Sequence, residues 1–427
     1  MRIGIAIGRI GGIDGVALET EKWITVLERM GHEVFILTGK LEAPIRNTSV
    51  LREMAFSHPE CIRDQDDAFF FQEVEETELA ERLGRGAAVI ERGIRRWLAE
   101  QRIEFLITQN STTLPCHLTM GMALRRVLEQ TGIAALAHDH DFHWERGDRY
   151  TTRYKTVRAI IDECFPPDLP NLRHAVINTH CRDSLAREMD IEAAVIPNVM
   201  DFKHPFARRD DFNRKLPEAL GLRSDDTLLF QITRIVRRKG IETAIELVHR
   251  LDDPSVRLVI TGTSQDDWNE EYTDELRAQV ADRGLSDAVL FAGERFGAVR
   301  SIDAGGRPVF SLEDAYSCAT ACTYFSRYEG FGNAFVEAVL ARRPVFVNNY
   351  KPVYWPDIGS KGFHTVQIED NELTDDAVAT IRSILSDVDA SREIAEHNFT
   401  LGRRYFSYEV LEELLDDLIS QHLHAAI

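Results

Sequence analysis

A glycine-rich turn with two glutamates is the stretch of this 427-residue chain whose residue types point most directly to chemistry. It reads SRYEGFGNAFVE over residues 326–337, between an apolar run typical of a strand and an alanine-rich run typical of a helix. Such a turn directs backbone N–H groups and the positive end of a helix dipole at one point, which favours a phosphate. The carboxylates of Glu329 and Glu337 are good acceptors for hydroxyl groups. The segment therefore predicts a sugar-nucleotide site.

A second charged group follows the apolar run 228–232, which we expect to be a strand. The sequence TRIVRRKG at 233–240 places four cations in a chain whose formal net charge is −20. In so acidic a protein this indicates an anion site, and preorganised cations stabilise the charge that develops on a departing diphosphate. The competing interpretation is a solvated basic start of a helix.

The 326–337 segment resembles the donor-site signature of retaining GT-B glycosyltransferases of family 4, in which Glu-Gly-Phe-Gly precedes a second Glu in the following helix. The resemblance implies that Glu329 approaches the hydroxyls of the transferred sugar and that Glu337 binds the nucleotide ribose. It implies further contacts to sugar or phosphate from the residues between them: Gly330, Phe331, Gly332, Asn333 and Ala334.

The basic cluster matches the same family. The family has an arginine just after this strand and a lysine five positions later, before a glycine, and Arg234 and Lys239 keep that spacing. The resemblance implies that both hold the donor diphosphate. We expect Arg237 and Arg238 to lie on the surface.

Three glycines give weaker matches to the family. Gly11 and Gly12 follow the first predicted strand, where family members place a loop near the donor phosphate, and Gly262 follows a strand at 258–260. Glycine is common after a first strand because the chain must turn tightly there. The glycines at 8, 11, 12 and 15 do not have the spacing of the dinucleotide fingerprint, which argues against NAD binding.

A histidine-rich segment at 137–146, AHDHDFHWER, allows two interpretations. His138, His140 and His143 with the neighbouring aspartates are residue types that bind zinc or manganese, so a metal-dependent hydrolase is one alternative. Through the family resemblance, His138 contacts the transferred sugar near the reaction centre, no metal is held, and Asp139, Trp144 and Arg146 face the acceptor. Trp144 would equally fit a core and Arg146 the surface.

Apolar runs alternate with helical patterns through both halves of the chain, which predicts an α/β fold with parallel sheets. The fold class we expect is two doubly wound, Rossmann-like domains facing across a cleft, the GT-B architecture. The expected organisation is an acceptor-side domain at 1–201, a linker at 202–225, a donor domain at 226–403 and a C-terminal helix at 404–427 that crosses back to the first domain. Ligands of such sheets bind beyond the carboxyl ends of the strands.

Composition narrows the partners and the compartment. The net charge of −20 argues against nucleic acid and anionic membranes. Six scattered cysteines are typical of reduced thiols, and no apolar run approaches the roughly 18 residues that span a bilayer, so we expect a cytoplasmic protein. The composition does not decide whether the chain forms a homo-oligomer.

The sequence therefore predicts a retaining, metal-independent glycosyltransferase without a cofactor. It would move a hexose from a UDP-, GDP- or ADP-hexose to a small polar hydroxyl acceptor, with cations in place of a divalent ion. A non-catalytic sugar-nucleotide binder is a further alternative. A glycoside hydrolase is disfavoured, because two glutamates eight residues apart on one helix stand roughly 12 Å apart, beyond the ~5–9.5 Å that hydrolysis uses. The segment 297–310 resembles an insertion that would serve as a lid, a partner surface or a loop.

Overall fold

The chain divides into two units, each with its own parallel sheet. The computed structural model describes residues 1–12, 14–206, 209–263 and 270–425, so part of the predicted linker (207–208) and the last two residues of the predicted C-terminal helix lie outside the described residues. Unit 1 comprises Met1–Val199 and Tyr408–Ile427, and unit 2 comprises Met200–Ser407.

Unit 1 contains a seven-stranded sheet in the order β3-β2-β1-β4-β5-β6-β7, with every neighbouring pair parallel. The strands are β1 (Arg2–Ile10), β2 (Glu33–Leu41), β3 (Thr48–Val50), β4 (Phe105–Gln109), β5 (Ala134–Asp139), β6 (Leu172–Val176) and β7 (Ala193–Val195). The helices are α1 (Gly15–Arg29), α2 (Pro59–Gln65), α3 (Glu76–Gln101), α4 (Leu118–Thr131), α5 (Lys155–Cys164), α6 (Thr179–Met189) and α15 (Tyr408–Ala425). Because the strand order reverses between β1 and β4, the sheet is doubly wound.

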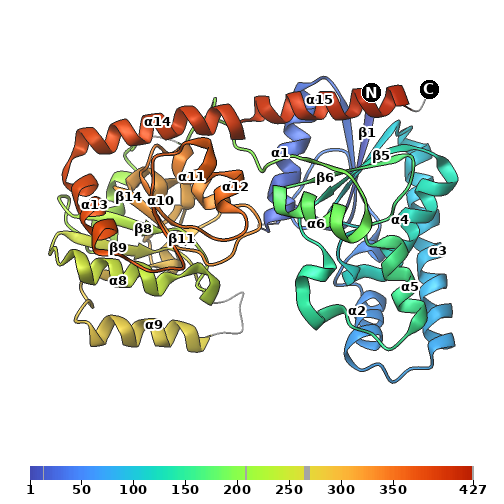
Figure 1. Cartoon of the computed structure of the whole chain (residues 1–427), viewed down its shortest axis with the longest axis horizontal. Coiled ribbons are helices and arrows are strands. Elements are labelled where there is room, and N and C mark those ends of the chain that lie inside the picture. Colours follow the sequence, from blue (N-terminus) through green and yellow to red (C-terminus); the bar gives the residue numbers. More distant parts are fainter. Residues whose placement is uncertain (13, 207–208, 264–269, 426–427) are drawn as a thin grey trace. The chain divides into compact units, whose positions relative to one another are not determined.

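Apolar side chains on both faces of this sheet explain why helices cover both. Alternate residues of β1, such as Ile3 and Ile5, share one core with α1 and α15, while α3 and α4 cover a second core on the opposite face. The stripe of α15 that includes Leu411 and Leu415 packs against α1, and Arg29 pairs with Glu409 and Glu412 at 2.9 Å each (Figure 1). The amphipathic C-terminal helix therefore completes the first unit.

Unit 2 repeats the pattern with six parallel strands in the order β10-β9-β8-β14-β15-β16. The strands are β8 (Thr227–Gln231), β9 (Val256–Ile260), β10 (Val289–Phe291), β14 (Ala321–Tyr324), β15 (Val345–Asn348) and β16 (Val366–Ile368). The helices are α7 (Leu216–Ala219), α8 (Ile241–Leu251), α9 (Glu270–Asp282), α10 (Leu312–Cys318), α11 (Asn333–Leu340), α12 (Tyr354–Asp357), α13 (Asp375–Ser386) and α14 (Val388–Phe406). In Figure 1, α8 and α9 lie on one side of β8 and β9, and α11 and α14 on the other.

Single helical turns connect many of these elements. They are η1 (Arg52–Met54), η2 (Asp66–Phe70), η3 (Pro115–His117), η4 (His143–Tyr150), η5 (Asn213–Lys215), η6 (Arg237–Lys239), η7 (Gly293–Arg295) and η8 (Gly359–Lys361). Among the described residues, no helix combines the length and the apolar character needed to cross a membrane.

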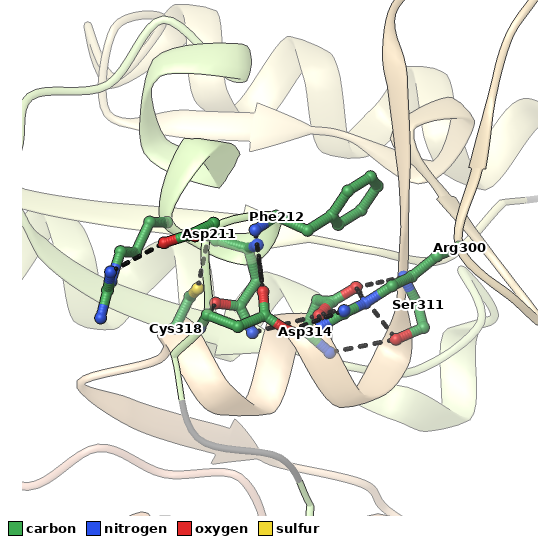
Figure 2. A network of polar contacts seen from close by, with 9 residues as sticks. Asp211, Phe212, Arg300, Ser311, Asp314 and Cys318 are labelled. Carbon is green, nitrogen blue, oxygen red and sulfur yellow. Dashed lines mark hydrogen bonds and ion pairs between the residues drawn. The ribbon is translucent and has the colours of Figure 1, made fainter.

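The segment 297–310 belongs to a small sheet that is tied to the body of unit 2. β11 (Phe296–Gly297), β13 (Pro308–Ser311) and β12 (Ser301–Ile302) form this sheet in that order. Arg300, just before β12, donates from Nε to both carboxylate oxygens of the buried Asp314 at 3.0 Å and from Nη1 to Asp210 at 2.7 Å. Figure 2 shows Arg300 directed at Asp314 in the first turn of α10. This anchoring favours a fixed structural element over a lid.

Candidate functional site

The loop between β14 and α11 holds the predicted sugar-binding glutamate. Gly332 has φ +127°, and a Cβ added there would lie 2.1 Å from the hydroxyl oxygen of Tyr350, so only glycine fits. The same hydroxyl donates to the carbonyl of Phe331 at 2.9 Å. Gly332 thus allows the chain to turn sharply after Glu329, and α11 begins at the next residue, Asn333.

The loop after β8 is brought against this first loop by a second glycine. Gly240 has φ +60°, and a Cβ there would lie 2.1 Å from the carbonyl oxygen of Phe325. The N–H of Arg327 donates to the carbonyl of Arg238 at 2.7 Å. Backbone contact between the two loops therefore places the basic cluster beside Glu329.

Lys239 and Glu329 form a buried ion pair at the meeting point of the loops. Their relative exposures are 9% and 8%, and Lys239 Nζ donates to Glu329 Oε1. Arg238 donates from Nη1 to the other oxygen, Oε2, at 2.8 Å. Burial opposes ionisation of Glu329, but the adjacent Lys239 and Arg238 outweigh it and lower the pKa of the carboxyl, so Glu329 is a carboxylate.

Of the two arginines predicted to lie on the surface, Arg237 points outward, whereas Arg238, with 40% of its side chain exposed, turns its guanidinium group toward Glu329. Arg238 is half-buried because it donates to Glu329 and also to the carbonyl of Tyr328 at 3.0 Å. Arg237 is exposed and pairs with Glu275 on α9. Of the three adjacent cations in η6, Arg237 turns outward while Arg238 and Lys239 both turn toward Glu329, and the sequence does not show which members turn inward.

Arg234, like Arg237, is an exposed cation of the cluster. Among the described residues its side chain has no hydrogen-bond or ion-pair partner, and its charge helps to lower the pKa of Lys239, after burial as the main cause. Gly262 packs against its backbone: a Cβ there would lie 2.0 Å from the carbonyl oxygen of Thr233 and 2.7 Å from the Cα of Arg234. Gly262 thus has a packing role that positions the residue predicted to hold the diphosphate.

Glu337 lies in the second turn of α11, half-buried, and accepts a hydrogen bond of 2.7 Å from the hydroxyl of Tyr316 on α10. Glu329 precedes the helix, so the two glutamates are not on one helix and the 12 Å spacing assumed from the sequence does not apply. Tyr316 was not predicted; no feature of its sequence neighbourhood marks it. The structure assigns it to fixing the Glu337 carboxylate.

Gly11 and Gly12 lie in unit 1, in the loop between β1 and α1. Gly11 has φ +81°, and a Cβ would lie 2.5 Å from the backbone nitrogen of Ala43; a Cβ on Gly12 would lie 2.1 Å from Glu42 Oε2. The carboxylate of Glu21 accepts a hydrogen bond from the backbone of Gly11. Backbone packing requires glycine at position 11, whereas the neighbour of Gly12 is the end of a flexible side chain, and the predicted role of both glycines at the donor stays a prediction.

His138, the residue before the last one of β5, is a buried, neutral imidazole. Its ring stacks on Trp23 at 4.1 Å between centroids, and Nδ1 lies 2.8 Å from Oε1 of Gln109. Burial, with a smaller effect from His140, holds its pKa well below the ordinary value. Nε2 is buried and has no hydrogen-bond partner in the described part of the chain. An unsatisfied ring nitrogen fits the predicted sugar contact, although the side chain is only 1% exposed.

Two of the residues predicted to face the acceptor make packing contacts, and their acceptor role stays a prediction. Asp139 is fully buried, and its Oδ2 lies 2.9 Å from Nδ1 of His174 on β6. Trp144 stacks on Phe142 at 4.7 Å and donates from Nε1 to Ser184 at 2.8 Å. Successive side chains of a strand point to opposite faces of the sheet, so Asp139 and His138 lie on opposite faces, and both are buried because helices cover both faces.

Arg146 lies on the surface, in the 3-10 turn η4, with 45% of its side chain exposed and an ion pair to Asp141. It keeps the exposure that acceptor contact requires. The acceptor role of Arg146 remains a prediction.

The histidines do not gather around one point. The rings of His138 and His140 meet edge to face, with 4.6 Å between their centroids. His143 interacts instead with the backbone of Phe165. Within the ranges that the structure describes, no group of three or more His, Cys, Asp or Glu side chains has the arrangement of a metal site. The arrangement gives no support to the hydrolase alternative.

Comparisons with known proteins agree with this architecture. A family model described as glycosyl transferases group 1 matches residues 212–400. The chain is 32% identical over 450 residues to mannosylglucosylglycerate synthase of Thermotoga maritima, which covers 97% of this chain and 99% of the relative.

Solved structures share the fold at lower identity. Sucrose-phosphate synthase from Thermosynechococcus elongatus matches with a TM-score of 0.63 and 17% identity over 99% of both chains. Anabaena HepE in complex with UDP-glucose matches with a TM-score of 0.63 and 13% identity over 98% of this chain and 99% of that one. The predicted α/β fold with two Rossmann-like units is confirmed. The chain belongs to the glycosyl transferases group 1 family and is a glycosyltransferase homologous to mannosylglucosylglycerate synthase.

Proposed function

We propose that this glycosyltransferase moves a mannosyl group from a nucleotide diphosphate to glucosylglycerate and so forms mannosylglucosylglycerate. The Thermotoga maritima relative named for that product aligns over nearly the full length of both chains. Glucosylglycerate is small, polyhydroxylated and anionic, which agrees with the small polar acceptor that the sequence predicts.

The observation that carries the proposal is the buried Lys239–Glu329 pair with Arg238 and Arg234 beside it. The donor diphosphate carries negative charge that Arg234 and Lys239 would hold. Glu329 keeps Lys239 oriented, and its carboxylate oxygens would accept hydrogen bonds from hydroxyl groups of the sugar. Glu337, fixed by Tyr316, would bind the ribose.

In the proposed reaction the bond between the anomeric carbon and the phosphate oxygen breaks, and the acceptor hydroxyl oxygen bonds to that carbon. The departing diphosphate takes the proton of the acceptor hydroxyl on the same face, so the anomeric configuration is retained. Negative charge grows on the leaving oxygen, and Arg234 and Lys239 stabilise the transition state more than the ground state. These cations would replace a divalent ion, so transfer would be metal-independent.

The test is a donor panel with glucosylglycerate as acceptor. UDP-, GDP- and ADP-mannose, with the corresponding glucose donors, are incubated with the chain with and without EDTA. We expect one mannose donor to release its nucleotide diphosphate. The product should be heavier than the acceptor by one hexose, and its NMR coupling should show the anomeric configuration of the donor. Donor binding without turnover would support a non-catalytic binder, an inverted anomer would exclude retention, and loss of rate with EDTA would exclude metal-independence.

A further inference from the structure

A pocket in unit 2 lined by arginines lies away from the donor loop. Its volume is about 420 Å³, and its charged lining consists of Arg209, Arg342, Arg343, Arg392 and Glu396. The backbone that borders it includes Thr320 and Pro344, which directly precede β14 and β15. The donor loop follows the carboxyl end of β14, so the pocket lies at the other end of the strands, where β14 and β15 begin.

Two of these arginines have acidic partners that account for their charge. Arg342 donates from Nε to Glu396 at 3.0 Å and stacks over the ring of Phe399 at 3.5 Å. Arg392 donates to Asp389 at 3.0 Å. Neither residue by itself requires a ligand.

Arg209 and Arg343 differ because carbonyl oxygens alone hold them in the described structure. Arg343 donates to the carbonyls of Tyr316 at 2.9 Å and Ser317 at 2.7 Å, and Arg209 donates to that of Cys318 at 3.1 Å. These carbonyls form the last turn of α10, whose partial negative charge is about half an elementary charge. Two full positive charges therefore face one helix end.

The two guanidinium groups are also close enough to repel each other. Arg343 is partly buried, and burial, with repulsion from Arg209, lowers its pKa although nearby thiols oppose this. A guanidinium group has five N–H donors, so the three hydrogen bonds to α10 leave several donors for a ligand. Planar guanidinium groups bind phosphate through paired hydrogen bonds.

We propose that this pocket binds a small anion with a phosphate or diphosphate group, at a site separate from the donor. The volume suits a ligand larger than a single phosphate ion. Arg209 and Arg343 supply the charge, and both sit on the last turn of α10, the helix whose Tyr316 also holds Glu337.

Calorimetric titration with inorganic pyrophosphate tests the proposal, with Arg209→Ala compared with Arg214→Ala. Arg214 is a matched control because it is exposed, pairs with Asp211 and lies five residues away. We expect two pyrophosphate ions per unsubstituted chain and per Arg214→Ala chain, one at each site. In Arg209→Ala the second ion should bind about 10-fold more weakly or not at all, the loss of one hydrogen bond to a charged group. Equal stoichiometry and affinity in both variants would overturn the proposal.

Arg343→Gln provides a second variant, with the same loss expected, and circular dichroism checks the fold of each. A measurement on the unsubstituted chain needs no variant: pyrophosphate should slow modification of Arg209 by phenylglyoxal but leave that of Arg214 unchanged. Equal rates for Arg209 with and without pyrophosphate would contradict the site. If only one pyrophosphate binds and Arg209→Ala removes it, the arginine pocket stands and the proposed donor site fails.

Discussion

Two polar segments follow the carboxyl ends of parallel strands, and the structure treats them in opposite ways. In unit 2, Lys239 and Arg238 from the β8 loop converge on Glu329 from the β14 loop. In unit 1, the side chains of the segment 138–146, which begins in the last two residues of β5, point to different places, with Asp139 buried against His174 and Trp144 packed on Phe142. A high density of reactive residue types therefore does not by itself predict a site.

The difference follows from what each side chain needs when it is buried. A buried lysine or glutamate requires an opposite charge, so Lys239 and Glu329 must meet. Neutral histidine and tryptophan side chains need no opposite charge, so members of the 138–146 segment form separate local contacts: Nδ1 of His138 lies 2.8 Å from Gln109, and Trp144 donates to Ser184. Fixed charges gather side chains, whereas neutral polar groups are satisfied one at a time.

The largest effect is expected from Lys239→Ala. It removes the cation that is predicted to hold the diphosphate, and a loss of about 3 kcal/mol or more in transition-state stabilisation corresponds to a transfer rate more than 100-fold lower. Rates are measured by nucleotide diphosphate release. Arg237→Ala is the matched control, because Arg237 is adjacent in η6 but pairs with Glu275 at the surface. A rate like that of the unsubstituted chain would remove Lys239 from the mechanism.

Lys239→Ala also leaves the carboxylate of Glu329 buried beside Arg238 alone. Breaking a buried pair costs about 3–5 kcal/mol, so a loss of activity in Lys239→Ala or Glu329→Ala has to be compared with a measurement of stability. Chemical denaturation of both variants, and of the Lys239→Met, Glu329→Met double variant, separates a catalytic loss from an unfolding loss.

The next effect concerns His174→Ala, on β6, which removes the partner of Asp139 in the segment 138–146. It leaves Asp139 buried without its hydrogen-bond partner, which should destabilise the chain by about 3 kcal/mol. The KM for acceptor, measured below the unfolding temperature, should not change. His180→Ala is the control, since His180 is partly exposed on α6. A changed acceptor KM at unchanged stability would restore Asp139 to the acceptor site.

The two buried carboxyls should give pH dependences of opposite sign. The folded pKa of Glu329 is lowered, because attraction from Lys239 and Arg238 exceeds the opposing effect of burial, so its contribution to stability exists above the ordinary pKa of 4.5 and is lost as pH falls through the folded value. Burial raises the pKa of Asp139 above 3.8, although His174 opposes it, so its contribution is present below 3.8 and is lost as pH rises through the folded value.

Free energies of unfolding across acidic pH, for Glu329→Gln and Asp139→Asn against the unsubstituted chain, check these signs. The difference for Glu329→Gln should shrink as pH falls, and that for Asp139→Asn should shift the other way. If the two differences changed with pH in the same direction, the pKa values of Glu329 and Asp139 would be shifted in the same direction, which would contradict the prediction.

The smallest effect is expected from Trp144→Phe. The ring stacking on Phe142 is kept and only the hydrogen bond to Ser184 is lost, which costs about 1 kcal/mol in thermal unfolding. Activity at saturating acceptor should stay unchanged. A raised acceptor KM without any loss of stability would show that Trp144 contacts substrate after all.

Much of the fold could be predicted because it is written in local patterns. Alternating apolar runs and helical stripes predict two doubly wound units, and the spacing of Arg234, Lys239, Glu329 and Glu337 predicts the family. Glycines such as Gly332 and Gly240 also help to predict the turns, because the positive φ angles of these turns are disfavoured for residues with a side chain.

The tertiary structure alone decided which side chains meet. Lys239 and Glu329 are 90 residues apart, as are the two loops that carry them, and Arg238 joins them only because η6 turns it inward. Likewise His138 stacks on Trp23, and Arg29 meets Glu409 at a separation of 380 residues. Periodicity and turn chemistry act over a few residues, whereas these contacts depend on how whole strands and helices pack, which no local pattern encodes.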